Sequence, residues 1–202
     1  NGAITGRMTH RNPNMAQVPS VHSPYGKECR SCWVVDDGNV LLGVDASGLE
    51  LRMLAHYMDD EKYIKEILDG DIHTANQKAA KLKSRNQAKT FIYALMYGAG
   101  DEKLGKVVEG NTTDLNTLLQ GAGAIVMKKA LVILDDLLKL NTIQYKFVAN
   151  IHDEWQIEVK ESQADFVGEL AVKSIIEAGE HFNLRCPMDG EYKLGRDWSE
   201  TH

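Results

Sequence analysis

The chain has 202 residues, of which 43% are hydrophobic and only 4 are proline, so it can bury a core and is not a disordered segment. No apolar stretch approaches the roughly 20 residues that cross a membrane. The formal net charge of -6 argues weakly against nucleic-acid binding, but residues 78–89 are basic and contain no acid, so a local basic stripe remains. The chain opens without a methionine or a signal peptide, so we expect a fragment located in the cytoplasm.

Three cysteines favour a reducing compartment. Cys29 and Cys32 form a CxxC pair, whereas Cys186 stands alone. A tetrahedral zinc site needs two further ligands, and the chain has no second CxxC and no HxxxH. We therefore interpret the thiols as structural or incidental.

Turn residues dominate residues 1–32 and predict loops and short extended pieces. Residues 33–45 predict a strand, a turn at 36–39 and a second strand over 40–44, which delivers Asp45 at its end. A helix is then predicted from Ser47, because Ser47 and Glu50 have the spacing of a capping box.

Further helices are predicted over 63–68, 73–82 and 85–97. A polar break follows, and Asp114 is expected to cap a long helix over 115–140.

Residues 145–151 and 154–159 predict a β-hairpin with Asp153 at its tip, and residues 163–182 predict an amphipathic helix with Phe166 on its apolar face. Strand pairs are separated by helical blocks and do not alternate strictly with helices. We therefore expect an α+β fold, with an antiparallel sheet and helices on one side.

Asp45 and Asp153 end two strand-like runs, and Glu154 adds a third carboxylate. Magnesium prefers oxygen ligands and is usually held by one or two carboxylates, substrate phosphates and water. Two such ions can assist an in-line displacement at phosphorus. Alternatively each aspartate is a turn or cap residue, since aspartate is common at strand ends.

Arg85, Lys89 and Tyr93 recur at four-residue spacing and share one face of the predicted helix. Arginine and lysine bind phosphate oxygens, and a tyrosine ring can stack on a sugar or base. The alternative is a solvated basic face above packed tyrosines. Glu50 is fully explained by the capping box, and His73 and His152 lie beside turns, where structural roles are common.

Five motifs resemble those of family A DNA polymerases, the group related to bacterial DNA polymerase I. VDASGLELR resembles their first catalytic motif, RNQAKTFIYALMYGAG their fingers helix and NIHDEWQIEV their third motif. TGRMTHRNPNMAQVP resembles the entry to their palm, and LNTLLQGAGA a palm helix at the template-primer. The motifs occur in the family's order along the whole chain. Their amino-acid sequences are most similar to those of replicative polymerases of podovirus-type phages.

The resemblance implies a right-hand polymerase fold without its thumb. Residues 1–58 would form the first part of the palm, residues 59–110 truncated fingers, and residues 111–202 the second part of the palm. The implied function is template-directed addition of dNMP to a primer 3′-hydroxyl in phage DNA replication. The implied partners are primer-template DNA, dNTPs and a processivity factor bound through the thumb.

The resemblance also implies site residues. Two Mg²⁺ ions, replaceable by Mn²⁺, would be held by Asp45, Asp153 and the Ala46 carbonyl, with Glu154 as an auxiliary carboxylate. Lys89 would donate a proton to the leaving pyrophosphate. The residues implied in nucleotide binding are Ala46, Glu50, His73, Arg85, Lys89, Tyr93 and Tyr97, with Glu50 excluding ribonucleotides. Those implied in DNA binding are Arg7, Asn116, Gln120 and His152.

The chain departs from the family between Gly98 and Asn116, where 17 residues stand in place of tens more. Either the chain is trimmed there, or loops are missing from the numbered sequence, which we favour. Three alternative functions follow: a catalytically incomplete DNA-binding core, a single-subunit RNA polymerase-like enzyme, and a His-Asp metal phosphohydrolase. The His-Asp phosphohydrolases carry this pair on helices, whereas His152 and Asp153 lie between residues that favour β-strands.

Overall fold

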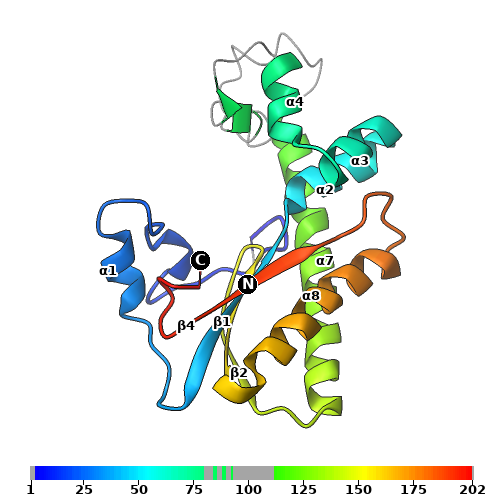
Figure 1. The fold of residues 1–202 in the computed structure, drawn as a ribbon. Coiled ribbons are helices and arrows are strands. Elements are labelled where there is room, and N and C mark those ends of the chain that lie inside the picture. The colour runs from blue at the N-terminus through cyan, green and yellow to red at the C-terminus, as the bar shows by residue number, and fades with distance from the viewer. Residues whose placement is uncertain (1–2, 80–83, 86–87, 90–91, 93–111, 202) are drawn as a thin grey trace.

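The computed structural model describes residues 3–79, 84–85, 88–89, 92 and 112–201 (Figure 1). Within these residues it has an α+β architecture, as predicted. The longest helices lie along one face of a twisted sheet, and shorter helices extend beyond one end of that sheet. No helix in these ranges is long and apolar enough to span a membrane.

The described strands form a 4-stranded sheet in the order β2-β3-β1-β4, and every neighbouring pair is antiparallel. The strand bounds are β1 Asn39–Ala46, β2 Tyr145–Ile151, β3 Glu154–Lys160 and β4 Gly190–Gly195. The predicted hairpin is confirmed as β2 and β3, and the predicted strand before Asp45 as β1. The sequence patterns gave no prediction for β4.

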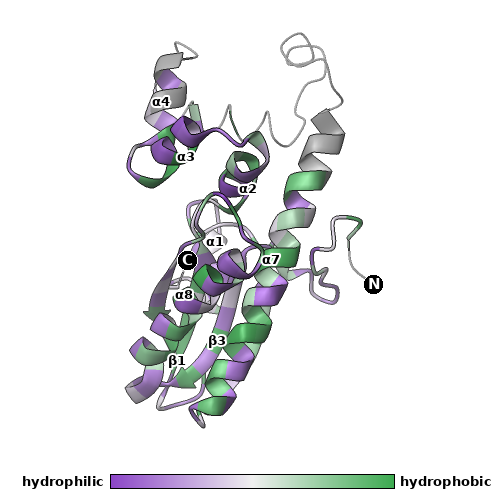
Figure 2. Ribbon diagram, turned by 90° about the vertical axis from the view of Figure 1, so that its right-hand side faces the viewer, coloured by the Kyte–Doolittle hydropathy of each residue, from purple (hydrophilic) through white to green (hydrophobic). Residues whose placement is uncertain are grey.

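One face of the sheet is covered by α7 (Thr112–Leu140) and α8 (Ala164–His181), which pack against each other. Because side chains alternate across a strand, Val40, Leu42 and Val44 of β1 point into this layer and are buried there. Figure 2 shows α7 lying along the sheet, with apolar and polar residues interspersed along its length. The core includes residues from all these elements: Trp155, Ile157 and Val159 of β3, Ala130, Leu134 and Leu138 of α7, and Val167, Ala171 and Ile175 of α8.

The opposite face of the sheet is covered by irregular chain. Leu41, Ile151 and Trp198 form a small buried cluster there, against which Met15 of η1 (Met15–Gln17) packs. Gly43 lies so close to residue Thr201 that a Cβ on the glycine would stand 2.3 Å from the Thr201 carbonyl oxygen. The segment after β4 therefore crosses the sheet at Gly43.

Two predictions about the first 45 residues are wrong in detail. Residues 26–31, expected to be loop, form the helix α1 (Gly26–Ser31). The strand expected after residue 33 is reduced to an isolated bridge between Val34 and Asp197. Both differences depend on contacts with the segment after β4, which local sequence does not encode.

The prediction that Ser47 and Glu50 form a capping box is also wrong. The helix α2 (Leu49–Met58) begins after Gly48, which has left-handed backbone (φ +59°) and caps without a side-chain hydrogen bond. Glu50 is instead drawn into an ion pair with Arg7. The short helix α3 (Glu61–Leu68) follows, two residues longer than predicted at its start. The helix predicted over 73–82 corresponds to α4 (Ile72–Ala79), and residues 80–82 lie outside the described part of the chain.

The remaining helices fit the predictions with two corrections. α7 is helical from Thr112, its first described residue, so Asp114 lies inside the helix and not at an N-cap position. On α8, which begins after η2 (Glu161–Gln163), Phe166 is 45% exposed, since the packed stripe runs through Val167, Ala171 and Ile175. Of the helix predicted over 85–97, only Arg85, Ala88, Lys89 and Ile92 are described, and all are helical.

Candidate active site

The two aspartates predicted to act together meet at one end of the sheet. Asp45 lies at the end of β1, where it pairs in register with Glu154, the first residue of β3. The Ala46 N–H donates to the Asp153 carbonyl oxygen at 3.2 Å. Asp153 sits in the tight β2–β3 turn, which His152 enters with left-handed backbone (φ +60°). The antiparallel pairing therefore brings together two residues that are 108 positions apart in the chain.

These aspartates line an open pocket of about 410 Å³. Its wall comes from β1, the β2–β3 turn, β4, the helices α2, α3 and α4, and the helical residue Lys89. The predicted site residues in this wall are Asp45, Ala46, Glu50, His73, Lys89 and Asp153. Acidic groups at the sheet end thus share one pocket with basic groups from the helices beyond it.

A second, smaller pocket of about 170 Å³ shares Asp45 and Glu191 with the first. Asp45, Glu154 and Glu191 line it together. They belong to three neighbouring strands, and Asp45 pairs in register with both glutamates, so all three point to the same face of the sheet. Glu191 was not predicted as a site residue, although its place in a short alternating run, GEYKLG, was a weak strand signal.

Burial dominates the electrostatics of Asp153. Burial first, and the negative charge of Glu50 second, raise the pKa of the Asp153 carboxyl to about 6. The Arg7 guanidinium acts in the opposite direction. A buried carboxylate close to other acids is a site at which a cation would relieve the repulsion.

Glu50 forms an ion pair with Arg7. The two side chains are only 7% and 15% exposed, so the pair is largely shielded from water. The N-terminal segment that carries Arg7 runs along α7, where a Cβ on Gly121 would lie 3.6 Å from the Thr5 carbonyl oxygen. The ion pair therefore fixes this segment to the start of α2.

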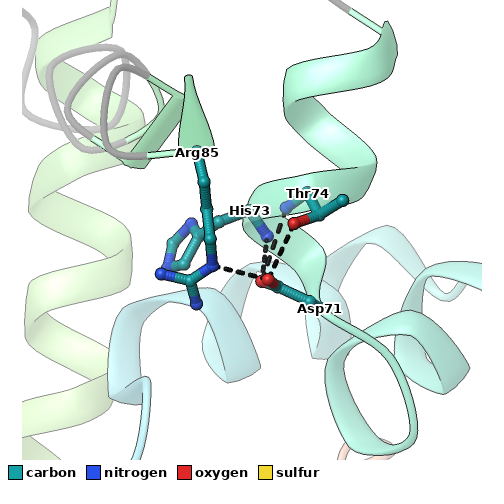
Figure 3. A network of polar contacts seen from close by, with 4 residues as sticks. All are labelled: Asp71, His73, Thr74 and Arg85. Carbon is teal, nitrogen blue, oxygen red and sulfur yellow. Dashed lines mark hydrogen bonds and ion pairs between the residues drawn. The ribbon is translucent and has the colours of Figure 1, made fainter.

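Asp71 organises the basic side of the pocket (Figure 3). One carboxylate oxygen accepts the backbone N–H groups of His73 (3.1 Å) and Thr74 (3.4 Å), which caps α4. The other oxygen accepts the Thr74 hydroxyl at 2.8 Å and Arg85 Nε at 2.5 Å. The hydrogen bond from Arg85 holds the pKa of the Asp71 carboxyl well below its usual range. The sequence showed Asp71 only as a turn residue, although its spacing to Thr74 is typical of a helix cap.

His73 is buried beside two cations. Burial lowers the pKa of its imidazole first, and the positive charges of Arg85 and Lys89 lower it further, with Asp71 opposing. The imidazole is therefore neutral near pH 7, while Arg85 and Lys89 supply the positive charge. Both cationic side chains are exposed, as groups that bind an anionic ligand must be.

The structure describes the side chains of only some of the residues predicted to bind DNA. Burial lowers the pKa of the His152 imidazole and nearby Arg7 lowers it further, so these two groups share one neighbourhood. Gln120 is partly buried on α7. Asn116 lies on the same helix, but its side chain is outside the described part of the structure, and Tyr93 and Tyr97 lie outside it altogether.

The donor set fits a hard divalent cation. Asp45 and Asp153 offer carboxylate oxygens at one pocket, joined by the Ala46 backbone. Among the described residues, no three His, Cys, Asp or Glu side chains are grouped tightly enough to hold a metal alone. Magnesium is usually coordinated by one or two carboxylates, and substrate phosphates and water molecules complete its coordination shell.

Comparison with known proteins identifies the family. The chain belongs to DNA polymerase family A, whose sequence model matches residues 1–114 and 107–200. Polymerases of this family generally depend on divalent metal ions. The chain is 37% identical to the DNA-directed DNA polymerase of Enterobacteria phage T3 and 36% identical to that of Escherichia phage T7, in each case along its full length.

The chain spans 40% of the length of these two curated relatives. The alignments extend over 282 positions against the 202 residues of the chain, so the relatives carry about 80 more residues within the matched region. The family match divides near residues 107–114, in agreement with the shortened region expected between Gly98 and Asn116.

A solved structure confirms the fold. The polymerase domain of Pol1 from M. smegmatis, in complex with DNA primer-template and dNTP, superposes with a TM-score of 0.83 at 20% identity. The match covers 98% of this chain and 47% of the other.

Proposed function

We propose that this chain is the nucleotidyl-transfer core of a template-directed DNA polymerase of phage type, acting in the host cytoplasm. One observation carries the proposal. In a family A chain, Asp45 and Asp153 line a single pocket together with His73 and Lys89, and the positive charge of Arg85 acts on His73. This arrangement supports metal binding by the two aspartates and triphosphate binding by the cationic side chains.

The division into subdomains is part of the proposal. Residues 1–58 and 111–202 form the palm, which contains the sheet, α7 and α8, and residues 59–110 form shortened fingers. The thumb lies outside this chain. The two phage relatives are named DNA-directed DNA polymerases, and the solved neighbour holds primer-template and dNTP, which supports DNA and dNTPs as ligands here.

Asp45, Asp153 and the Ala46 carbonyl would hold two Mg²⁺ ions, which Mn²⁺ can replace. When bound, such ions stabilise the charge that develops on the attacking and leaving oxygens of an in-line displacement. The primer 3′-oxygen forms a bond to the α-phosphorus of the dNTP as the bond to the β-phosphate oxygen breaks. Lys89 provides the proton that the leaving pyrophosphate takes up.

The basic group orients the substrate. Arg85 and Lys89 bind the phosphates, and His73 adds a neutral hydrogen-bonding group. Glu50, in the wall of the same pocket, occupies the space that a ribose 2′-hydroxyl would need. Tyr93 and Tyr97 pack against the incoming sugar and the templating pair.

On the DNA side, Arg7, Asn116 and Gln120 contact minor-groove acceptors, which all correct base pairs present alike. His152 supports the primer end. A processivity factor would bind through the thumb of a longer protein.

Two alternative functions remain testable. A single-subunit RNA polymerase would share the carboxylates, but Glu50 in the pocket wall and the names of the relatives favour DNA. An inert DNA-binding core would bind primer-template without incorporating a nucleotide. The phosphohydrolase is disfavoured because His152 and Asp153 lie in a β-hairpin turn.

Single-nucleotide primer extension with Mg²⁺ tests the proposal. We expect the wild-type chain to add one dNMP, and Asp45→Ala and Asp153→Ala to lower the rate at least about a hundredfold, because metal assistance is worth several kcal/mol. The matched control is Asp37→Ala, in the exposed turn before β1. Equal extension by all four proteins would contradict the metal assignment, whereas efficient use of rNTPs would favour the RNA polymerase. No extension with retained, salt-dependent DNA binding would indicate an inert core.

A further inference from the structure

The segment that follows β4 is buried against the carboxylate face of the sheet. Trp198 and Thr201 are 2% and 4% exposed. The backbone N–H of Trp198 donates to the Trp33 carbonyl oxygen at 3.1 Å, and the Arg30 guanidinium carbon lies 4.3 Å from the centre of the Trp198 ring. Arg30 is itself buried and donates to the Pro19 carbonyl oxygen at 2.9 Å. Trp198 is thus fixed through both its backbone and its ring.

The held indole has a specific polar contact. Trp198 Nε1 donates to Glu154 Oε1 at 2.8 Å. The same carboxylate oxygen accepts Gln156 Nε2 at 2.5 Å, and Gln156 Oε1 accepts the Thr201 hydroxyl at 2.9 Å. All four side chains are buried, so each hydrogen bond is shielded from competing water.

Gly43 provides the space for this network. It is the register partner of Gln156, and a Cβ on Gly43 would lie 2.8 Å from Gln156 Nε2 as well as 2.3 Å from the Thr201 carbonyl oxygen. Only a residue without a side chain allows the amide and the threonine to approach this part of β1. The network therefore depends on a bare backbone two residues before Asp45.

The network ends beside the proposed metal ligands. Glu154 follows Asp153 directly, pairs in register with Asp45 and lines the small pocket together with Asp45 and Glu191. Two N–H donors on one carboxylate oxygen fix its position and offset part of its charge, which allows a third acid to stay close to the two aspartates.

We propose that residues 197–201 are a positioning element of the active site, in which Trp198 directly and Thr201 through Gln156 hold the Glu154 carboxylate in place beside Asp45. This inference rests on the proposed polymerase function. Trp198, Gln156 and Thr201 are positioning residues that act through Glu154 and do not touch the substrate.

The test compares two tryptophans. Trp198→Phe removes the N–H that Glu154 accepts, whereas Trp155→Phe removes an N–H on an equally buried ring whose Nε1 has no hydrogen-bond partner among the described residues. Both variants replace a buried indole by a smaller phenyl ring, so Trp155→Phe controls for the loss of packing in Trp198→Phe. We expect Trp198→Phe to lower kcat and weaken Mn²⁺ binding, measured by electron paramagnetic resonance, about tenfold, because ligand-orienting groups have effects of 10–100-fold. The Kd for primer-template should not change, and Trp155→Phe should match wild type in all three measurements.

A double-mutant cycle shows whether the effect passes through Glu154. In a Glu154→Ala background, Trp198→Phe should cause no further loss. A full additional loss there, or equal behaviour of Trp198→Phe and Trp155→Phe, would overturn the proposal and leave the polymerase function intact. If the wild type incorporates no nucleotide, the proposed function fails, and the Mn²⁺ affinities alone decide the positioning role.

Thr201 gives a second, gentler variant pair if Trp198→Phe does not fold. Thr201→Val removes the hydroxyl that Gln156 accepts, and Thr201→Ser keeps it. We expect a severalfold loss of kcat and Mn²⁺ affinity for valine and recovery for serine. Equal values for the two variants would contradict the role of Thr201.

Discussion

At the scale of single residues, the surroundings of Asp153 disfavour the ionised form of its carboxyl. Burial and the charge of Glu50 both disfavour its negative form, and Arg7 compensates only in part. Such a group is better suited to hold a cation than to stabilise the empty protein. Ionisation of Asp153 should therefore lower the free energy of unfolding of the metal-free protein.

The first prediction is a pH dependence of unfolding. The pKa of Asp153 is about 6 in the folded chain against 3.8 as the ordinary value, so the folded state binds its proton more tightly than the unfolded state. Its contribution to stability is complete below about pH 4 and is lost as the pH rises through 6. A shift of about 2 pKa units corresponds to about 3 kcal/mol.

Urea unfolding at pH 4 and pH 7 in the presence of a chelator measures this loss. The wild type should lose about 2 kcal/mol more than Asp153→Asn between the two pH values, because part of the full effect lies outside this range. Asp37→Asn, in an exposed turn, should behave as wild type. The same loss in Asp153→Asn would show that another group is responsible.

At the scale of elements, α4 begins with a cap that is also an ion pair. Asp71 caps the helix through His73 and Thr74 and orients Arg85 through its second oxygen. The Nε contact leaves the terminal nitrogens of Arg85 outside this hydrogen bond. One side chain thereby couples the start of α4 to a proposed phosphate-binding group.

The second prediction separates the two roles. Asp71→Asn keeps an oxygen for the cap but loses the charge that orients Arg85. The KM for dNTP should rise, by less than about fivefold because the pair is exposed, with kcat little changed. Asp60→Asn makes the same change in the cap of α3 and should leave KM unaltered. A fall in KM for Asp71→Asn would mean that Asp71 competes with the phosphates for Arg85.

The third prediction concerns the crossing of β1 by the segment after β4. Gly43→Ala places a Cβ 2.3 Å from the Thr201 carbonyl oxygen, so backbone must move. The expected cost is about 1–3 kcal/mol in free energy of unfolding, measured by urea denaturation.

Gly121→Ala is the matched control for Gly43→Ala. On α7 the new Cβ meets only the Thr5 carbonyl oxygen at an ordinary 3.6 Å, and alanine favours a helix. This variant should be as stable as wild type or more so. Comparable losses at both glycines would show that the crossing at Gly43 tolerates a side chain.

At the scale of the whole molecule, the sheet, α7 and α8 form one continuous core. Burial also separates the three cysteines by reactivity. Cys186 is fully buried, and burial raises the pKa of its thiol. Cys29 and Cys32 are exposed on and just after α1.

The fourth prediction follows from this difference. A thiol-specific reagent should label Cys29 and Cys32 in the native protein and Cys186 only after unfolding, because the thiolate is the reactive form and must be accessible. Mass spectrometry with and without denaturant counts the labels. Rapid labelling of Cys186 would show that the core opens locally, and protection of the CxxC pair would contradict its interpretation as two free thiols.

The sequence by itself determined the features that depend on neighbouring residues. Alternating side chains predicted β1 and the hairpin with Asp153 in its turn, and helical periodicity predicted α3 and α8. The order of the motifs predicted family A, which the comparisons confirm. These features could be predicted because periodicity and motif spacing are properties of the chain itself.

Only the tertiary structure decided which distant side chains meet. Glu50 pairs with Arg7 rather than capping α2, Glu154 is held by Trp198 from 44 residues away, and Phe166 faces outward from α8. A buried polar group takes the partner that the packed fold places within hydrogen-bond distance, since leaving it unpaired costs more than any local preference gains. That choice depends on the sheet order and the crossing at Gly43, which no local pattern in the sequence specifies.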